Sequence, residues 1–209
     1  MNKANLIERY EASDRINHWL VAITFVVLAV SGLALFHPSM FFLSNLLGGG
    51  PWTRILHPFI GLVMFVSFVF LAMRFWRHNV LDKNDKQWLK QWEDVVNNRE
   101  DKLPEVGRYN AGQKVLFWVM VGCVIVLLLT GFVIWQPYFT PAFHITLVRI
   151  AVVLHALAAF LLILGIIVHI YAAIWVKGTI RAMTRGYVTH VWAKKHHPAW
   201  YLEVTDKRR

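Results

Sequence analysis

Four histidines lie at or within the long apolar segments of this 209-residue chain: His18, His57, His155 and His169. An imidazole surrounded by hydrocarbon is costly and usually has a function, such as binding a metal ion or relaying a proton. One such histidine could simply hydrogen-bond a neighbouring helix. Four of them at matching depths favour a role as ligands.

The spacing of His155 and His169 places both on one face of a helix. They are 14 residues apart. At 100° per residue this separation falls within about 40° of four complete turns, with a rise of ~21 Å. Two sites at different depths in a membrane are therefore expected, one toward each surface.

The elements that position these histidines are four apolar segments. Hydrophobic residues make up 57% of the chain, which is more than a soluble domain of this length can bury. Each segment is long enough for a transmembrane helix, the one conformation here that satisfies backbone groups in lipid. We predict an all-α, integral membrane four-helix bundle, with Ser13 and Asn110 as helix N-caps. It forms a single domain over residues 1–209, with spans at about 19–36, 55–73, 115–135 and 150–176, a loop at 74–114 and a tail at 177–209.

The basic residues predict the orientation in the membrane. Of the 22 Lys and Arg residues, 20 lie in the amino-terminal segment, the 74–114 loop or the tail, and the exceptions are Arg54 and Arg149. Because Lys and Arg collect on the cytoplasmic side, both termini, the loop and the tail are expected there. The net charge of +10 is confined to segments beside the apolar runs, which favours an anionic membrane surface and not nucleic acid. The 74–114 loop contains Trp88 and Trp92 among its basic residues. It could therefore form short helices on the membrane surface, or it could be a loosely ordered loop.

With this orientation, His57 and His155 share the outer half of the membrane, and His18 and His169 share the inner half. Each level offers two imidazoles and no carboxylate or thiolate, whereas zinc normally takes three or four protein ligands. Haem iron needs only two axial ligands, so we predict two haem groups. The single Cys123 and the lack of a Cys-x-x-Cys-His sequence exclude a disulfide framework and covalently attached haem. Two imidazoles leave no open position on the iron, which favours electron transfer.

Several further residues allow two interpretations. Arg54 and Arg149 are candidates for pairing with the propionates of the outer haem, or they are ordinary membrane anchors. Gly61 and Gly165 would let a flat ring approach the backbone, or they serve helix packing. The other six histidines are not expected to be ligands. Two of them lie in the outer connections, His37 and His144. The other four are expected at the surface: His78, His190, His196 and His197.

Six short sequences occur in order along the chain: RINHW at 15–19, RILHPF at 54–59, GRYNAGQK at 107–114, HIYAA at 169–173, KGTI at 177–180 and AKKHHP at 193–198. With their spacing they resemble the gamma subunit, cytochrome b556, of respiratory membrane-bound formate dehydrogenases. The similarity covers nearly the whole chain and implies the same four histidine ligands, in the same pairs, for two haem b groups. It also implies a menaquinone or related quinone near the inner haem, bound by Asn110, Gly112, Gln113 and His169. From the residues alone, the first three would form a plain helix cap and turn.

The resemblance implies partner subunits as well. An iron–sulfur beta subunit would deliver electrons from the periplasmic side, and a molybdenum- or tungsten-containing alpha subunit would oxidise formate. The chain itself would not oxidise formate. It would pass electrons through both haems to quinone at the cytoplasmic side of a bacterial inner membrane. Several such heterotrimers could associate.

Two alternatives remain open from the sequence. A cytochrome b subunit of a membrane-bound hydrogenase or thiosulfate reductase shares this arrangement of helices and haems. A haem-free transporter or membrane anchor would use the histidines as a proton relay or as contacts between helices. Such a protein would not need histidines paired at two depths.

Overall fold

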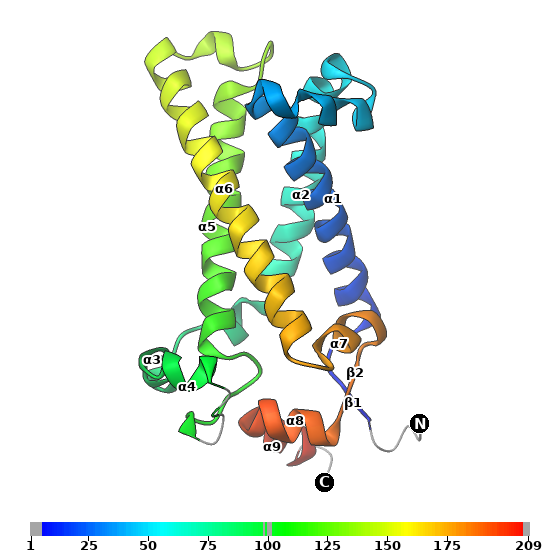
Figure 1. Ribbon diagram of the computed structural model, residues 1–209, viewed down its shortest axis with the longest axis vertical. Helices are drawn as coiled ribbons and strands as arrows, with labels where there is room; N and C mark the ends of the chain where they lie inside the picture. The colour runs from blue at the N-terminus through cyan, green and yellow to red at the C-terminus, as the bar shows by residue number, and fades with distance from the viewer. Residues whose placement is uncertain (1–5, 98, 100–101, 207–209) are drawn as a thin grey trace. The chain divides into compact units, whose positions relative to one another are not determined.

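The computed structural model describes residues 6–97, 99 and 102–206, and most of them are helical. Within these residues, four helices are long and apolar enough to cross a membrane (Figure 1): α1 (Ala12–Phe36), α2 (Gly50–Phe75), α5 (Ala111–Ile134) and α6 (Ile145–Trp175). They confirm the four predicted helices. All four begin several residues before the apolar runs, so His18 and His57 lie inside their helices and not at the first residues.

The start of α1 differs from the prediction. Ser13 is the second residue of the helix and not its N-cap. The carboxylate of Asp14 accepts a hydrogen bond from the Glu11 backbone N–H at 3.4 Å. This bond satisfies a backbone donor at the helix start, so the helix begins one residue before the predicted cap.

Short 3-10 helices lie in the connections from α1 to α2 and from α5 to α6. The 3-10 helix η2 (Pro38–Leu47) follows α1, and η5 (Thr140–Ala142) lies between α5 and α6. Between η2 and α2, Gly48 and Gly49 have φ values of +84° and +95°, a backbone conformation that glycine adopts without steric penalty. This turn begins α2 seven residues before His57.

The four long helices expose most of their apolar side chains. Only 11% to 17% of the residues in the most apolar stretch of each helix are buried. Large side chains such as Val26, Leu129 and Leu157 are more than half exposed. So large an apolar surface is incompatible with water but suits lipid, a partner helix or an apolar cofactor.

The described chain forms two compact units. The first comprises residues 16–73 and 119–168 and is called the bundle unit below. Its buried core contains side chains from α2, α5 and α6: Met64, Phe68, Cys123, Val124 and Leu162. Side chains of α1 pack against this core. Asn17 of α1 also donates to the Ser67 carbonyl of α2 at 2.9 Å. Cys123 is thus a packing residue.

The second unit comprises the described residues within 1–15, 74–118 and 169–209 and is called the polar unit below. Strands β1 (Leu6–Glu8) and β2 (Tyr187–Thr189) pair antiparallel, with Ile7 opposite Val188. Three short helices follow the long α6: α7 (Thr179–Arg185), α8 (His190–His196) and α9 (Pro198–Asp206). The buried core joins strands and helices: Ile7, Ala182, Val188, Ala193 and Trp200. The all-α prediction missed this small sheet, because three-residue strands are too short to show an alternating pattern.

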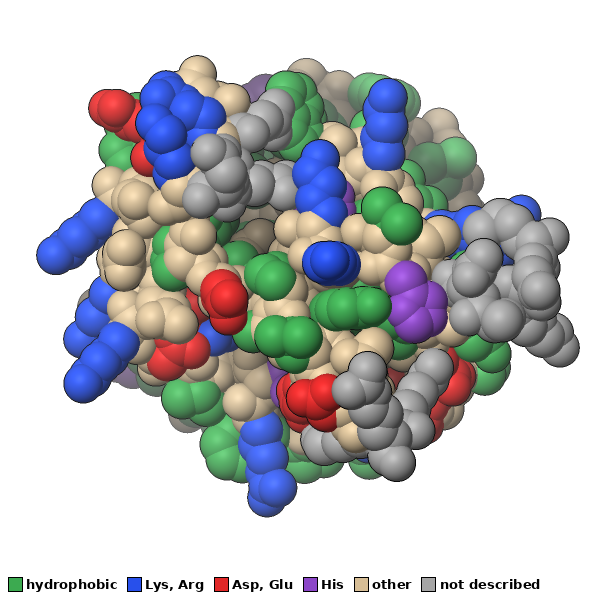
Figure 2. Space-filling model, turned by 90° about the horizontal axis from the view of Figure 1, so that it is seen from below, with side chains coloured by type: hydrophobic (Ala, Val, Ile, Leu, Met, Phe, Trp, Pro, Cys, Tyr) green, Lys and Arg blue, Asp and Glu red, His purple; other side chains and the backbone are tan. Residues whose placement is uncertain are grey.

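The segment between α2 and α5 also belongs to the polar unit. It contains η3 (Trp76–Asn79), α3 (Lys83–Lys90) and α4 (Trp92–Val96). Of the two alternatives for the loop, the structure therefore has short helices. The face of the molecule in Figure 2 carries Lys and Arg side chains along much of its margin, with acidic side chains among them.

Arg9 ties three distant parts of the polar unit together. Its side chain is 5% exposed and donates to the Arg108 carbonyl at 2.7 Å, while Arg108 donates to the Arg9 carbonyl at 2.6 Å. The guanidinium carbon lies 4.6 Å from the ring centre of Trp200 and 5.2 Å from that of Trp192. Such cation–π contacts stabilise a buried cation. The amino terminus, the segment before α5 and the tail are thereby held as one body.

The prediction that His197 is a surface residue is wrong. Its side chain is 4% exposed because the tail folds back onto Arg9. The Nδ1–H donates to the Gly107 carbonyl at 2.8 Å, and Nε2 accepts from Arg9 at 3.3 Å. Both ring nitrogens are therefore satisfied by a neutral imidazole. His78 is exposed as expected, whereas His190 and His196 are half-buried.

The pKa of His197 predicts a pH-dependent tail. Burial, followed by the nearby Arg9 guanidinium, lowers this pKa from 6.5 to about 3. Between these two pH values the unfolded chain binds a proton at His197 and the folded chain does not. The contribution of the neutral His197 to the free energy of unfolding is therefore fully present above pH 6.5 and is lost as the pH falls toward 3. At pH 5 the loss is about 2 kcal/mol. Limited proteolysis of the tail, or fluorescence of Trp192 and Trp200, should report this loosening.

A matched substitution isolates this effect. His197→Asn keeps an N–H near the Gly107 carbonyl but cannot take up a proton. We expect it to be less stable at pH 7.5 and to lose the pH dependence between 6.5 and 4. His190→Asn removes a histidine from the same helix-rich tail and should keep the dependence. An unchanged pH profile in His197→Asn would contradict the assignment.

Candidate haem and quinone sites

His57 of α2 and His155 of α6 face each other within the bundle unit. Their ring centres are 6.4 Å apart, and the ring planes meet at 61°. Imidazoles on opposite sides of one metal ion have ring centres roughly 6 Å apart, because each metal–nitrogen bond is about 2 Å long. Among the described residues no group of three or more His, Cys, Asp or Glu side chains could hold a metal. The pair therefore suits an ion that needs just two protein ligands, such as haem iron.

Both histidines have their Nδ1 atoms engaged by hydroxyl groups. Ser31 Oγ of α1 lies 2.7 Å from Nδ1 of His57, and Thr130 Oγ1 of α5 lies 2.9 Å from Nδ1 of His155. Each hydroxyl donates its single proton to a carbonyl of its own helix, at 3.1 Å for Ser31 and 2.6 Å for Thr130. With its proton on that carbonyl, each hydroxyl can accept the Nδ1–H, and the lone pair of each Nε2 is then available to a metal ion.

A glycine follows each of these hydroxyl residues and lies beside the imidazole. A Cβ on Gly32 would come within 3.5 Å of Cε1 of His57, and a Cβ on Gly131 within 3.6 Å of Cε1 of His155. A larger side chain at either position would fill the space beside the ring. By contrast, a Cβ on Gly61 would meet the side chain of Leu28 at 3.9 Å, so Gly61 belongs to a helix contact.

The sequence analysis missed these four residues, Ser31, Gly32, Thr130 and Gly131. One signal for them does exist. A Ser-Gly pair begins 26 residues before His57, and a Thr-Gly pair begins 25 residues before His155. Each pair lies on the long helix that precedes its histidine.

The other two predicted ligands lie in α1 and α6. His18 is half-buried, and its ring lies edge-on to that of Trp19 with ring centres 5.6 Å apart. His169 is exposed and follows His155 by 14 residues in the same helix. Because His18 belongs to the bundle unit and His169 to the polar unit, their pairing stays a prediction.

Arg54 and Arg149 lie near the first turns of α2 and α6. Both side chains are exposed, and neither has an ion pair within residues 6–97, 99 and 102–206. A free guanidinium at the end of a membrane helix fits either a propionate partner or a membrane anchor.

The predicted quinone residues begin α5. Asn110 Oδ1 accepts from the Gln113 backbone N–H at 2.9 Å, and Gln113 Oε1 accepts from the Asn110 backbone N–H at 3.0 Å. These reciprocal bonds are a capping box, so the predicted N-cap is confirmed. The capping box uses the side-chain amide oxygens of Asn110 and Gln113. The side-chain NH2 groups of these two residues take no part in it.

Gly112, which was expected to approach a quinone, lies beside Trp88. A Cβ at this position would lie 3.3 Å from Cη2 of Trp88. That distance is tighter than an ordinary contact, so glycine here makes room for the indole of α3. The backbone of Gly112 is thus covered on this side by Trp88.

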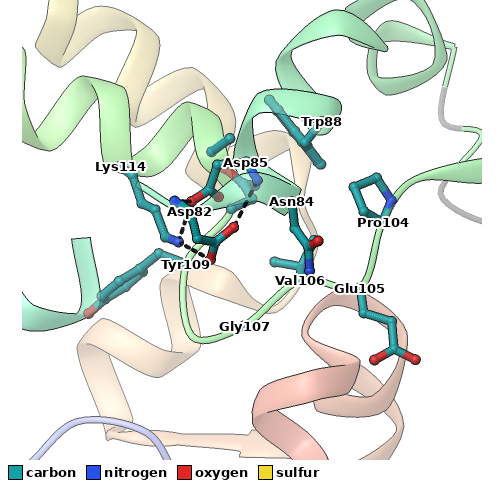
Figure 3. Close-up of a pocket in the computed structure, with 12 residues that line it drawn as sticks. Asp82, Asn84, Asp85, Trp88, Pro104, Glu105, Val106, Gly107, Tyr109 and Lys114 are labelled. Atoms are coloured by element: carbon teal, nitrogen blue, oxygen red, sulfur yellow. Dashed lines mark hydrogen bonds and ion pairs between the residues drawn. The ribbon is translucent and has the colours of Figure 1, made fainter. Parts of the chain in front are cut away.

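A polar pocket lies beside these residues in the polar unit (Figure 3). Lys114 Nζ lies 2.6 Å from Asp85 Oδ2 and 3.4 Å from Asp82 Oδ2. Burial, followed by the nearby Tyr10, raises the pKa of Tyr109, which stays a neutral hydroxyl. The pocket includes Asn110 but not Gly112, Gln113 or His169, and its lining is Asp82, Asn84, Asp85, Trp88, Pro104, Glu105, Val106, Gly107, Tyr109, Asn110, Ala111 and Lys114.

Comparison with known proteins identifies the family. A family model described as prokaryotic cytochrome b561 matches residues 9–186. The formate dehydrogenase cytochrome b556(fdo) subunit of Escherichia coli strain K12 is 50% identical over 211 residues, which cover all of this chain and 99% of that protein. The chain belongs to this cytochrome b556 family. The nitrate-inducible cytochrome b556(Fdn) subunit of the same strain is 44% identical over 98% of this chain and 94% of its own length.

A third relative agrees. The formate dehydrogenase cytochrome b556 subunit of Haemophilus influenzae is 44% identical over 94% of this chain and 83% of that protein. Membership confirms a membrane cytochrome b that binds haem b and is a subunit of a formate dehydrogenase complex. The sequence-based choice of formate dehydrogenase over hydrogenase and thiosulfate reductase is thus confirmed.

Proposed function

We propose that this chain holds two haem b groups and carries electrons from a partner subunit to quinone on the opposite side of the membrane. The observation that carries the proposal is the pair His57 and His155, whose ring separation and occupied Nδ1 atoms suit a shared iron. When bound, haem supplies a one-electron carrier that needs no open coordination position. His18 and His169 are proposed as the ligands of the second group.

The residues around the ligands have supporting roles in this proposal. Ser31 and Thr130 orient the imidazoles, and the apolar side chains of the four helices exclude water. Arg54 and Arg149 would neutralise the propionates of the outer haem, because a guanidinium binds a carboxylate with two parallel hydrogen bonds.

The quinone is proposed to bind near the start of α5. The amide N–H groups of Asn110 and Gln113 are neutral donors for a quinone carbonyl, and the helix N-terminus favours the negative charge that develops on reduction. His169 would be a further donor. Proton uptake from the cytoplasm, combined with inward electron flow, would generate a membrane potential.

The orientation and partners complete the proposal. The basic amino terminus, loop and tail would lie in the cytoplasm beside a bacterial inner membrane. An iron–sulfur beta subunit would supply electrons, a molybdenum- or tungsten-containing alpha subunit would oxidise formate, and several such heterotrimers would associate. The chain itself would not oxidise formate.

The test uses the purified membrane complex. Formate should reduce the haem, seen in the reduced-minus-oxidised spectrum, and should drive menaquinone reduction. Asn110→Ser keeps a helix cap but loses the amide donor, so we expect the KM for quinone to rise about 5-fold with haem content unchanged. Asn110→Ala, which also loses the cap, is the comparison. A complex whose haem formate does not reduce would contradict the electron-carrier function, and wild-type kinetics in Asn110→Ser would contradict the quinone site.

A further inference from the structure

We propose that Ser31 and Thr130 are matched positioning residues that fix the tautomer of His57 and His155 and tune the reduction potential of the haem between them. The proposal rests on the proposed function, because it assumes that these two histidines are the ligands of one haem. It assigns a role to two hydroxyl groups that the sequence analysis did not single out.

Burial makes the two hydroxyls the natural acceptors for the imidazoles. Ser31 is 0% exposed and Thr130 is 8% exposed. Both imidazoles lie among apolar helices, where an Nδ1–H without an acceptor would cost about 1–3 kcal/mol. The hydroxyls stand 2.7 Å and 2.9 Å from the two Nδ1 atoms. They are therefore in place to accept those protons, and for His155 the Leu127 carbonyl is a second acceptor.

Each hydroxyl has a carbonyl of its own helix to which it can donate, and this leaves its oxygen able to accept from the imidazole. Ser31 donates to the Leu28 carbonyl and Thr130 to the Val126 carbonyl. Bonds from a hydroxyl to its own helix are common, and by themselves they indicate no function. Thr24, which is half-buried, shows that ordinary case with a bond to the Leu20 carbonyl at 2.7 Å. Ser31 and Thr130 differ from Thr24 because each of them also contacts an imidazole of a neighbouring helix.

The same device occurs on both sides of the proposed haem. Ser31-Gly32 in α1 serves a histidine of α2, and Thr130-Gly131 in α5 serves a histidine of α6. In both places the hydroxyl meets Nδ1 while the glycine leaves space beside Cε1. Helix packing alone does not require that two unrelated helix pairs repeat this arrangement. A shared task at two equivalent ligands accounts for it.

The chemistry of this contact gives a direction of effect. An imidazole that donates its Nδ1–H is a more basic ligand through Nε2. A more basic ligand stabilises ferric over ferrous iron, because the ferric ion carries the greater charge. Loss of either hydroxyl should therefore raise the midpoint potential of one haem and should also let the ring turn.

The experiment compares variants of the purified complex. Ser31→Ala and Thr130→Val remove one hydroxyl each, and Thr24→Val is the matched control because its hydroxyl bonds only to its own helix. Ser31→Thr and Thr130→Ser restore a hydroxyl. The readouts are the potentiometric midpoint of each haem, the low-spin ferric resonance, which senses ligand orientation, and the rate of haem loss.

We expect Ser31→Ala and Thr130→Val each to raise the potential of one haem component, leave the other unchanged and speed haem loss about 10- to 100-fold. The restoring variants should return both quantities toward wild type. Values equal to those of Thr24→Val would overturn the proposal, and so would an effect that the restored hydroxyl does not reverse. If the wild-type complex instead held no haem that depends on His57, the ligand assignment itself would be wrong, and that outcome is distinct.

Discussion

Replacement of His155 by alanine is expected to remove one of the two proposed haems and to stop the proposed formate-driven reduction of quinone. His57 would remain as a single axial ligand, and two imidazoles are what hold a haem in an apolar bundle against loss. Because the electron path would be broken, activity should fall by at least about 100-fold, more than the loss caused by a residue that only supports a ligand. Haem per polypeptide and formate-to-menaquinone rates measure the two effects.

His144→Ala is the matched control for this variant. His144 lies one residue before α6, is exposed, and accepts a hydrogen bond from the Thr146 backbone N–H at 3.3 Å. It is the same residue type close to the same helix, so its loss should leave haem content and activity unchanged. A His155→Ala protein that keeps its full haem complement would show that His155 is not a ligand.

The features that could be predicted from the sequence depend on neighbouring residues. A transmembrane helix is recognised from the length and hydropathy of one segment, and all four appeared where expected. The capping box at Asn110 and Gln113 likewise depends on residues three apart. The facing of His57 and His155 combined local helix spacing with the direction in which each helix crosses the membrane. Those steps use no contact between distant segments.

The missed features depend on such distant contacts. Arg9 meets the ring of His197 across 188 residues, and His197 meets Gly107 across 90. The sequence around His197 is basic and polar, so it resembles a surface segment until the tail folds back. Ser31 was overlooked for a related reason. A serine in an apolar helix is ordinary, and only the histidine of the neighbouring helix gives it a role.

Replacement of Lys114 by methionine is expected to destabilise the polar unit strongly. The ion pair between Lys114 and Asp85 is closed from solvent, with 9% and 8% of the two side chains exposed and an N–O distance of 2.6 Å. Methionine would leave the Asp85 carboxylate buried without its partner, which costs about 3–5 kcal/mol. α3 should then separate from the start of α5 and unfold, which would let trypsin cleave at its lysines, because a protease cuts an unfolded segment faster than a helix. Thermal unfolding of the purified complex and the rate of cleavage within α3 measure the effect.

Two further variants separate lost charge balance from lost packing. In Lys114→Met/Asp85→Asn both charges are gone, yet asparagine can still accept the capping bond that the Asp82 backbone N–H makes at 2.8 Å. Removing both partners of a buried pair is often nearly neutral, so the double variant should recover most of the stability. Lys90→Met removes an exposed lysine of α3 and should change stability by less than about 0.5 kcal/mol. If Lys114→Met behaved like Lys90→Met, the buried pair would not be what joins α3 to α5, and the pocket beside Asn110 would owe its shape to Trp88 and Gly112 instead.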